Sequence, residues 1–500
     1  MTAAEPAATA VEAGGPAVEP APPAVDPGGT AGRLAAAPAA GRAAGPDRRW
    51  WVLAVLASVA FMAQLDLFIV NIALPAMTAS FRGAGLGDLS WVLNAYAIVF
   101  AALLVPAGRL ADHFGRRRFL LTGVVVFILA SALCAVAPTL AVLVAGRVVQ
   151  AAGAALIVPA SLGLLLPAFP RRQHTLVVGI WAGVAAVAAS AGPPVGGLLI
   201  ELSWRWIFLI NLPIGVLALI GGLRFLPEVR AERGARLPDP LSAAALLAAV
   251  TLLVLGTIQG PGWGWASPAT LGTLAAGAIA AAVTVRRTLR QPHALIEATL
   301  FRSREFTAAA IALFLVFVAF AAFLLITVLF LQDQWDYSPL RAGLAIAPGP
   351  VAAAVFAISS GRIAGRFGRT VPALAGTLAI AGAAFFWLFA TPARPSYLAF
   401  FLPGMILAGV GSGLTQAPLF AAAGTLPPHR ATTGSAVLTM ARQIGSAIGV
   451  AVLVALLATS HPHSLAVFHR GWILQAAAAL AAAAAIVIMR PRARARVSPR

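Results

Sequence analysis

Long apolar runs alternate along the chain with short segments that contain Arg, Pro or Gly. A run of about 20 apolar residues matches the ~30 Å hydrocarbon core of a bilayer, so each run is predicted to be a membrane-spanning helix. Transmembrane β-strands would instead give alternating segments of about 10 residues. The pattern predicts fourteen spans, near residues 51–77, 89–111, 118–137, 141–166, 174–199, 206–226, 238–258, 269–286, 306–331, 341–363, 370–390, 397–420, 431–457 and 471–489.

The composition agrees with this pattern. Of the 500 residues, 60% are hydrophobic and only 10% are charged, and the mean hydropathy is +0.91. Soluble domains contain about 25% charged residues. An all-α integral membrane protein is therefore expected, rather than a soluble enzyme, a fibrous protein or a disordered chain. The single cysteine, Cys134, excludes an intrachain disulfide and a multi-cysteine metal site, and no metal site is predicted.

The arginines predict the orientation of the chain. All 35 basic residues are Arg, and the formal net charge is +19. With the N-terminus inside, five arginines fall in expected outer turns and two fall within spans, whereas 28 lie on the inner side. Because Arg is costly to translocate, this bias predicts a multi-pass cell-membrane protein with both termini in the cytoplasm. The charge is thus explained without a nucleic-acid partner.

The middle of the chain predicts an inserted hairpin. Arginine clusters at 224–236 and 286–290 should both be cytoplasmic, and the segment between them is long enough to cross the membrane twice. Trp263 and Trp265 at its turn suit the membrane interface. The expected organisation is a disordered cytoplasmic tail (1–49), a six-helix half (50–227), the hairpin with its linkers (228–290), a second six-helix half (291–490) and a basic cytoplasmic tail (491–500).

The two halves resemble each other in sequence. The string Gly108-Arg-Leu-Ala-Asp-His-Phe-Gly-Arg116 returns 253 positions later as Gly361-Arg-Ile-Ala-Gly-Arg-Phe-Gly-Arg369, and Gly192 and Gly445 lie the same distance apart. Two parallel six-helix repeats are typical of transporters whose substrate path lies between the repeats. A chance match between Gly- and Arg-rich loops is the alternative.

Five motifs, in order along the chain, resemble those of one transporter family. They are Leu65-Asp-Leu-Phe-Ile-Val-Asn-Ile-Ala-Leu-Pro75, the Gly108–Arg117 loop, Arg147 with Gln150, Gly192-Pro-Pro-Val-Gly-Gly197, and Ser203-Trp-Arg-Trp-Ile-Phe-Leu-Ile-Asn-Leu-Pro213. Together they resemble the major facilitator superfamily, and within it the fourteen-helix drug:proton antiporter branch (the EmrB/QacA subfamily). The resemblance covers residues 51–489 and implies the major facilitator fold.

Asp66 is the only acidic residue deep in a predicted span, about fifteen residues into the first one. An ionised carboxylate there is costly unless it is paired or hydrated, so it is expected to face a water-filled cavity and to exchange a proton as access alternates. The resemblance implies the same proton-coupling role. A structural carboxylate satisfied by neighbouring helices is the alternative. The family usually has a small hydroxyl residue where this chain has Phe68, which alters the local polarity.

Two arginines fall within spans. Arg147 resembles the fourth-helix Arg that the family associates with proton coupling, although an Arg six residues from the helix end could also snorkel to the interface. Arg442 lies near the middle of the thirteenth span, so it is expected to face protein or water, as a gate or as a substrate contact. Scattered amides are further candidates for the cavity wall, with interhelical packing as the alternative: Asn71, Asn94, Gln150 and Gln416.

The loop between the second and third spans is the candidate conformational latch. Its glycines allow a tight turn, and its arginines hold the loop in the cytoplasm. The resemblance implies that Asp112 and Arg109 latch the two halves, with Asp112 near the N-terminus of the thirteenth helix. An ordinary inner loop is the alternative. The residues assigned to the latch are Gly108, Arg109, Asp112, Gly115, Arg116 and Arg117.

The fifth span contains the motif that the resemblance associates with antiporters. Glycines there allow close helix packing, and prolines bend the helix, so a generic kinked packing helix is the alternative. The residues assigned to this motif are Gly192, Pro193, Gly196 and Gly197.

The predicted function is proton-driven antiport that exports lipophilic small molecules, cationic ones among them, as in multidrug or antibiotic efflux. The proton gradient would supply the energy and no cofactor is expected; without lysine, a Walker-type ATP site is excluded. The partners would be the substrate, protons and the bilayer, and nothing indicates a periplasmic adaptor. Symport of a metabolite and a non-transport membrane enzyme are the alternatives, although the short, Arg-bearing loops offer no catalytic residues, so no enzyme is predicted.

Overall fold

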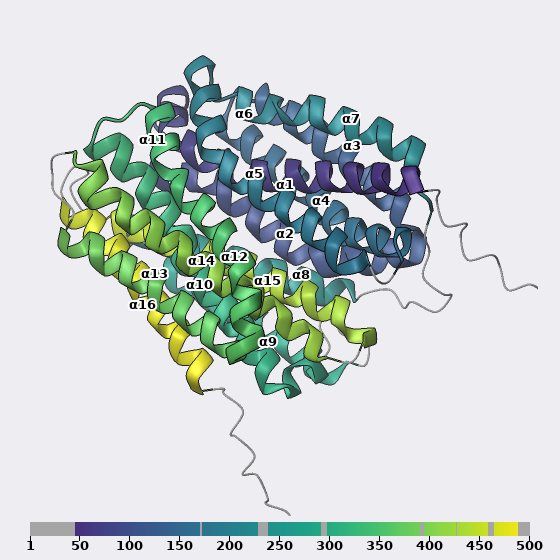
Figure 1. Ribbon diagram of the computed structural model, residues 1–500. Coiled ribbons are helices and arrows are strands. Elements are labelled where there is room, and N and C mark those ends of the chain that lie inside the picture. The colour runs from purple at the N-terminus through teal and green to yellow at the C-terminus, as the bar shows by residue number, and fades with distance from the viewer. Residues whose placement is uncertain are drawn as a thin grey trace, which may run out of the picture. The chain divides into compact units, whose positions relative to one another are not determined.

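The computed structural model describes residues 46–170, 173–228, 239–291, 298–390, 395–426, 428–458 and 465–488, which form helices joined by short connections (Figure 1). The predicted tails at 1–49 and 491–500 lie almost wholly outside these ranges. The elements are α1 (Pro46–Ser80), α2 (Leu86–Phe114), α3 (Arg116–Ala135), α4 (Leu140–Ala168), α5 (His174–Leu202), α6 (Trp206–Leu209), α7 (Asn211–Phe225), α8 (Pro240–Trp263), α9 (Pro268–Arg290), η2 (Ala298–Arg302), α10 (Arg304–Leu329), η3 (Phe330–Gln334), α11 (Pro339–Ile346), α12 (Pro348–Phe367), α13 (Thr370–Ala390), η4 (Tyr397–Phe401), α14 (Leu402–Phe420), η5 (Ala421–Thr425), α15 (Pro428–Leu457) and α16 (Leu465–Ile488).

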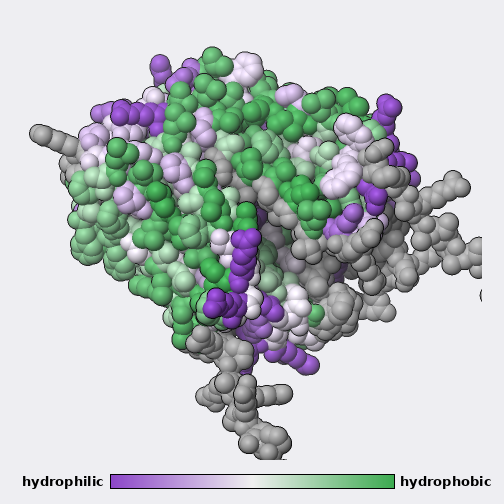
Figure 2. Space-filling model, in the orientation of Figure 1, coloured by the Kyte–Doolittle hydropathy of each residue, from purple (hydrophilic) through white to green (hydrophobic). Residues whose placement is uncertain are grey.

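Within the described ranges, every predicted span coincides with helix to within two residues at its ends. Thirteen helical stretches in the described ranges are long and apolar enough to cross a membrane, and α5, with 29 residues, covers the remaining predicted span. Many large apolar side chains are exposed, and Figure 2 shows hydrophobic residues over most of the visible face. A soluble monomer rarely exposes so much contiguous apolar surface. The expected all-α, multi-pass membrane fold is confirmed.

Two predicted spans are interrupted rather than continuous. The sixth breaks at Ile210 into α6 and α7, and the tenth breaks at Ala347 into α11 and α12. Proline follows each break closely, at Pro213 and Pro348. Because proline has no backbone N–H to donate, it fits the first turn of a helix better than its interior.

The same pairs of helices pack together in the two halves. In the N-terminal half α1 packs on α5, α2 on α4, and α3 on α4 and α7; in the C-terminal half α10 packs on α15, α12 on α14, and α13 on α14 and α16. Figure 1 shows α1, α3 and α7 side by side. The halves meet where α2 packs on α15 and where α5 packs on α11 and α12. Exchanging the halves converts one of these contacts into the other, as a two-fold relation between parallel repeats requires.

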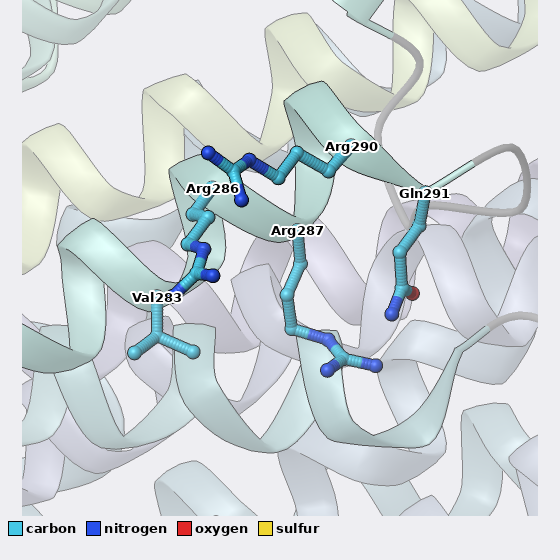
Figure 3. Close-up of a pocket in the computed structure, with 5 residues that line it drawn as sticks. All are labelled: Val283, Arg286, Arg287, Arg290 and Gln291. Atoms are coloured by element: carbon cyan, nitrogen blue, oxygen red, sulfur yellow. The ribbon is translucent and has the colours of Figure 1, made fainter.

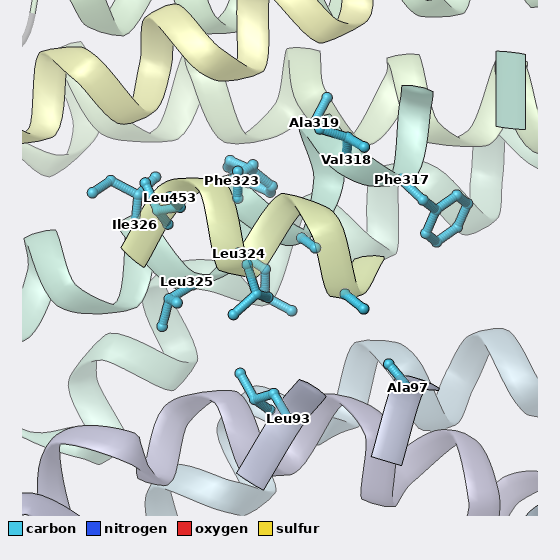
Figure 4. Packing of buried hydrophobic residues seen from close by; sticks show 14 of the residues in the cluster. Leu93, Ala97, Phe317, Val318, Ala319, Phe323, Leu324, Leu325, Ile326 and Leu453 are labelled. Atoms are coloured by element: carbon cyan, nitrogen blue, oxygen red, sulfur yellow. The ribbon is translucent and has the colours of Figure 1, made fainter. Parts of the chain in front are cut away.

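The core is continuous across the junction of the halves. One cluster of buried apolar residues includes Leu93 and Ala97 of α2 and Leu324 and Leu325 of α10 (Figure 4). A second cluster lies within the N-terminal half, around Phe127 of α3. Because side chains fill both clusters, motion between the halves must exchange one packed arrangement for another.

The hairpin α8–α9 packs on this junction. Helix α8 contacts α9 on one side and both α2 and α15 on the other, so it touches one helix from each half. Asp239 caps α8 by accepting a hydrogen bond from the Leu241 amide, and Ser267 caps α9 by accepting one from Thr270. The turn contains Gly264 at φ +87°, a conformation that favours glycine. Trp263 and Trp265 are exposed at this turn.

Candidate functional site

The structure brings Asp66 and Arg147 together in the interior of the N-terminal half. A guanidinium nitrogen of Arg147 lies 2.6 Å from a carboxylate oxygen of Asp66, and both side chains are at most 1% exposed. Asp66 lies on α1 and Arg147 on α4, which pack against each other. The Arg147 side chain therefore turns inward to Asp66 instead of reaching the membrane interface.

Three further side chains complete a polar network around Asp66. The Gln150 amide donates to the second Asp66 oxygen at 2.8 Å and to the Ser131 hydroxyl at 2.8 Å. The Asn211 amide donates to the same Asp66 oxygen at 3.0 Å and to Ser131 at 3.3 Å. All these side chains are fully buried, and they come from α1, α3, α4 and α7.

Arg147 is held by more than its ion pair. It donates from Nε to the Val92 carbonyl of α2 at 2.9 Å and from Nη1 to the Gln150 side-chain oxygen at 2.6 Å. Its guanidinium stacks over the ring of Tyr96 at 4.3 Å, and Phe208 lies 5.9 Å away. The stack adds cation–π attraction, which is strongest away from water. The site thus links the carboxylate on α1 to two turns of α2.

The energetics of this network make it sensitive to protonation. Taking two charges into the interior costs several kcal/mol per ion, which the short ion pair and its hydrogen bonds must offset. Removing one charge leaves the other buried and uncompensated, at a cost of about 3–5 kcal/mol. Adding a proton to Asp66 would therefore alter the balance that holds Arg147 against α1 and α2.

Arg442 occupies a second, separate position on α15. Its guanidinium lies 5.4 Å from the ring centre of Phe317 and 6.0 Å from that of Phe420, and its Nε has no hydrogen-bond partner among the described residues. Tyr96 is within Coulombic range of both Arg147 and Arg442. Arg442 is therefore a half-buried cation among aromatic rings, across the junction from the Asp66 network.

The four amide side chains that were predicted to line the cavity lie in different environments. Gln150 belongs to the Asp66 network. Asn71 donates to the Leu67 carbonyl of its own helix at 3.1 Å. Asn94 is fully buried, and neither of its amide atoms has a partner in the described ranges, whereas Gln416 is half-buried. The structure brings only Gln150 of this set to Asp66.

The predicted latch loop is anchored within its own half. Gly115 joins α2 to α3 at φ +114°, where a side chain would be strained. Arg116 donates to the Gly163 carbonyl of α4 at 2.6 Å, and Arg117 donates to the Leu223 carbonyl of α7 at 2.6 Å. A methyl group at Gly108 would lie 3.3 Å from Pro159 of α4.

One part of the latch prediction cannot be followed in the structure. The Asp112 side chain and the side chains at 428–432, at the start of α15, lie outside the described part of the chain, whereas the Arg109 side chain is engaged in a contact. Sequence reasoning did not single out Glu228, which accepts a hydrogen bond from the Arg117 amide at 3.3 Å and lies 3.9 Å from Arg118. The latch role therefore stays a prediction.

The glycines of the fifth-helix motif pack closely against two different helices. A Cβ at Gly192 would lie 2.8 Å from Phe68, and one at Gly196 would lie 2.7 Å from Ile69, both on α1. Pro193 and Gly197 instead belong to the contact with α11: a Cβ at Gly197 would lie 2.6 Å from the Leu340 Cα, and one at Gly343 of α11 would touch the Pro193 backbone. The motif thus joins the helix that contains Asp66 to the other half.

Two residues of the site, Ser131 and Tyr96, were not identified from the sequence, and a third, Asn211, was noticed but not assigned to the site. Ser131 gave no signal, because a serine in an apolar helix commonly bonds its own backbone. Tyr96 was missed because a lone aromatic in a span is ordinary core. Asn211 stood in the Ser203–Pro213 motif, but only the fold brings α7 to α1.

Comparison with known proteins agrees with this architecture. Residues 56–450 match the model of the Major Facilitator Superfamily. The chain is 38% identical over 411 residues to the Multidrug resistance protein Stp of Mycobacterium tuberculosis, covering 81% of this chain and 76% of that protein. It is 34% identical over 418 residues to the Tetracenomycin C resistance and export protein of Streptomyces glaucescens, covering 82% and 76%. It is 35% identical over 427 residues to the Lincomycin resistance protein of Streptomyces lincolnensis, covering 85% and 88%.

The matched region includes the Asp66 network, the latch loop and the glycine motif, together with most of both six-helix halves. The chain therefore belongs to the Major Facilitator Superfamily.

Proposed function

We propose that this protein is a proton-coupled antiporter that exports lipophilic small molecules, antibiotics among them, across the cell membrane. The names of its relatives support export and resistance as the activity. The Asp66–Arg147 network, an ion pair buried in a chain of apolar helices, is the observation on which the coupling rests. Intramembrane charges of this kind mark ion and proton pathways.

The proton would act by competing with Arg147 for Asp66. While Asp66 is ionised, Arg147 is held between α1, α2 and α4. Protonation removes the ion pair and frees Arg147 to follow α2, which packs on α15 of the other half. A change of charge at one residue would thereby bias a two-state movement of the halves.

The contacts between the halves favour one access state. Gly197 with Leu340, Gly343 with Pro193, and Gly87 with Val454 bring the halves together near the ends of the helices that lie away from the Gly108–Arg117 loop. With the arginine-rich loops in the cytoplasm, as the positive-inside rule favours, these contacts would close the outer side. The substrate would enter from the cytoplasmic side or the bilayer and leave when this closure opens.

The residues near Arg442 suit a lipophilic substrate. Phe68 of α1 and Phe320 of α10 meet edge to face at 6.0 Å across the junction, and Phe317 lies 5.5 Å from Phe320. These rings offer apolar contact, and the Arg442 Nε offers a hydrogen bond to a carbonyl or anionic oxygen. Because Asp66 is already paired, the described contacts favour neutral or oxygen-rich compounds over cations.

Transport measurements on proteoliposomes test this function. Purified protein is reconstituted with an imposed pH gradient, and the flux of dyes and antibiotics is followed for the wild type and Asp66→Asn. We expect gradient-driven flux in the export direction for the wild type and its loss in the variant. Asp88→Asn, the same change at an exposed carboxylate on α2, is the control and should transport normally.

Two results would contradict the proposal. Undiminished gradient-driven flux by Asp66→Asn would remove the proposed coupling residue. Movement of substrate and protons in the same direction would indicate symport instead of antiport. Neither a nucleic-acid partner, an adaptor, a cofactor nor an enzymatic activity is part of the proposal.

A further inference from the structure

Two cavities lie at the arginine-bearing end of the hairpin, away from the Asp66 network. One, of about 530 Å³, opens between α2 and α8 and is lined mostly by apolar side chains such as Leu103, Pro106 and Leu247. The other, of about 280 Å³, lies along one face of α9, where Figure 3 shows Val283, Arg286, Arg287, Arg290 and Gln291. The larger cavity falls within the ~300–1,000 Å³ typical of sites for small ligands.

An ion pair joins the two cavities. Arg287 of the smaller cavity donates from Nε to Asp239 of the larger one at 2.9 Å, and the Ser242 hydroxyl also donates to this carboxylate. The hydrogen bond from Arg287 lowers the pKa of Asp239 to about 2, so this carboxyl group stays ionised at physiological pH. The charge of Arg287 is therefore balanced within the protein.

The charges of Arg286 and Arg290 are not balanced in this way. Both side chains are exposed, and neither makes an ion pair or hydrogen bond with another residue in the described part of the chain. They are one helical turn apart on α9, so their guanidinium groups can reach the same anion. Guanidinium groups bind phosphate oxygens through paired hydrogen bonds.

We propose that this end of the hairpin is a binding site for an anionic phospholipid. The headgroup phosphate binds Arg286 and Arg290, and an acyl chain occupies the apolar cavity between α2 and α8. Clusters of basic residues at the cytoplasmic end of membrane helices attract such anionic headgroups. Only a molecule with both an anionic head and an apolar tail uses both cavities, and the bilayer around the exposed apolar helices supplies it.

The position of α8 gives the lipid a structural consequence. Helix α8 packs on α2 of one half and α15 of the other, whereas α9 has its main contact with α8 alone. A lipid held between α2 and α8 fills space beside the junction of the halves, and its headgroup holds the end of α9. Bound lipid is therefore expected to stabilise the hairpin against this junction, because a ligand stabilises the state that binds it.

The test measures lipid binding to the full chain purified in detergent. Phosphatidylglycerol, phosphatidylcholine and inorganic phosphate are titrated separately, and the melting temperature and the bound lipid detected by native mass spectrometry are recorded. We expect phosphatidylglycerol to raise the melting temperature of the wild type and to stay bound. The double variant R286Q/R290Q should need roughly tenfold more phosphatidylglycerol for the same shift, because two charge-assisted contacts are lost.

Two further variants separate the headgroup from the tail. R362Q/R366Q removes two exposed arginines with the same spacing on α12 and should bind as the wild type does. Ala244→Phe, at an exposed wall of the larger cavity, should weaken phosphatidylglycerol binding although every arginine remains.

The proposal is overturned if R286Q/R290Q binds as tightly as the wild type, or if R362Q/R366Q loses as much affinity, since general surface charge would then explain the effect. It is also overturned if inorganic phosphate or phosphatidylcholine reproduces the whole stabilisation. None of these readouts depends on transport, so their failure is distinguishable from failure of the proposed export activity.

Discussion

At the scale of single residues, the molecule is organised around one buried ion pair. Asp66 receives hydrogen bonds from Arg147, Gln150 and Asn211, which together offset part of the cost of burying its carboxylate in an apolar interior. Arg147 in turn reaches α2 through Val92 and Tyr96. The pair thus links α1, α2 and α4, and in the proposed antiport it is also the site that takes up the proton.

The coupling of these two charges can be measured as a stability difference. Arg147→Gln leaves Asp66 without its cation and should destabilise the protein by about 3–5 kcal/mol. Adding Asp66→Asn should recover most of this loss, because the double variant buries no charge. Thermal unfolding in detergent checks both values.

Measuring proton-driven transport in the same single and double variants complements the stability measurements. The double variant should be stable and yet show no proton-driven flux. Arg341→Gln, at an exposed arginine that stacks on Tyr337, is the matched control and should change neither property strongly. If the two substitutions were simply additive in stability, the pair would not be coupled as described.

At the scale of helices, glycine lets neighbouring helices approach closely, both within each half and between the halves. Gly192 and Gly196 of α5 pack on α1, just as Gly445 and Gly449 of α15 pack on α10 against Phe314 and Val318. Each pair belongs to the fifth helix of its half and packs on the first helix of that half. The glycines that recur 253 residues apart in the sequence therefore make the same kind of contact in both halves. Gly197 and Gly343 add the contact between α5 and α11.

A methyl group at this contact should open it. Gly343→Ala would put a Cβ 2.7 Å from the Pro193 carbonyl carbon, and Gly197→Ala would put one 2.6 Å from the Leu340 Cα. Backbone atoms cannot rotate away, so either change should cost about 1–3 kcal/mol in the packed state and shift the halves apart at this end. Distances between spin labels on α5 and α11 should lengthen or broaden.

Glycines in open space provide the control for this prediction. A Cβ at Gly361 or Gly365 of α12 would meet no atom within 4 Å. Gly365→Ala should therefore leave the distances between the labels unchanged. Equal distances in Gly343→Ala and the wild type would mean that the contact tolerates a side chain and does not limit the approach of the halves.

The sequence predicted the helices better than their contacts. Fourteen spans were readable because the length of an apolar run is a local property that the bilayer imposes. The break at Ile210 was not predicted, since proline near a helix start and proline within a helix look alike in a sequence. Asp66 was singled out because a charge in an apolar span is conspicuous, whereas Ser131 and Tyr96 acquire their roles only when α2 and α3 come to α1 and α4.

At the scale of the whole molecule, the halves are joined by two contacts that their exchange relates, α2 with α15 and α5 with α11 and α12. The hairpin adds α8 to the first of these contacts. If transport requires the halves to separate at the closed end, then a covalent bond across that end must stop it, whereas a bond within the hairpin must not.

Engineered disulfides test this requirement. A Cβ at Gly87 of α2 would lie 3.9 Å from a Val454 side-chain methyl on α15, so Gly87→Cys and Val454→Cys would place two thiols next to each other across the junction. The single native cysteine, Cys134, is buried and can be replaced by alanine to give a cysteine-free background. We expect oxidation to abolish transport in this pair and reduction to restore it.

A second disulfide shows whether cross-linking itself is harmful. Gly277→Cys with Leu253→Cys would join α9 to α8 inside the hairpin, where a Cβ at Gly277 would lie 2.9 Å from the Leu253 side chain. This bond crosses no junction between the halves, so transport should continue in its oxidised form. Continued transport with the α2–α15 disulfide intact would mean that the halves do not part there, and the substrate would have to cross the membrane by another movement.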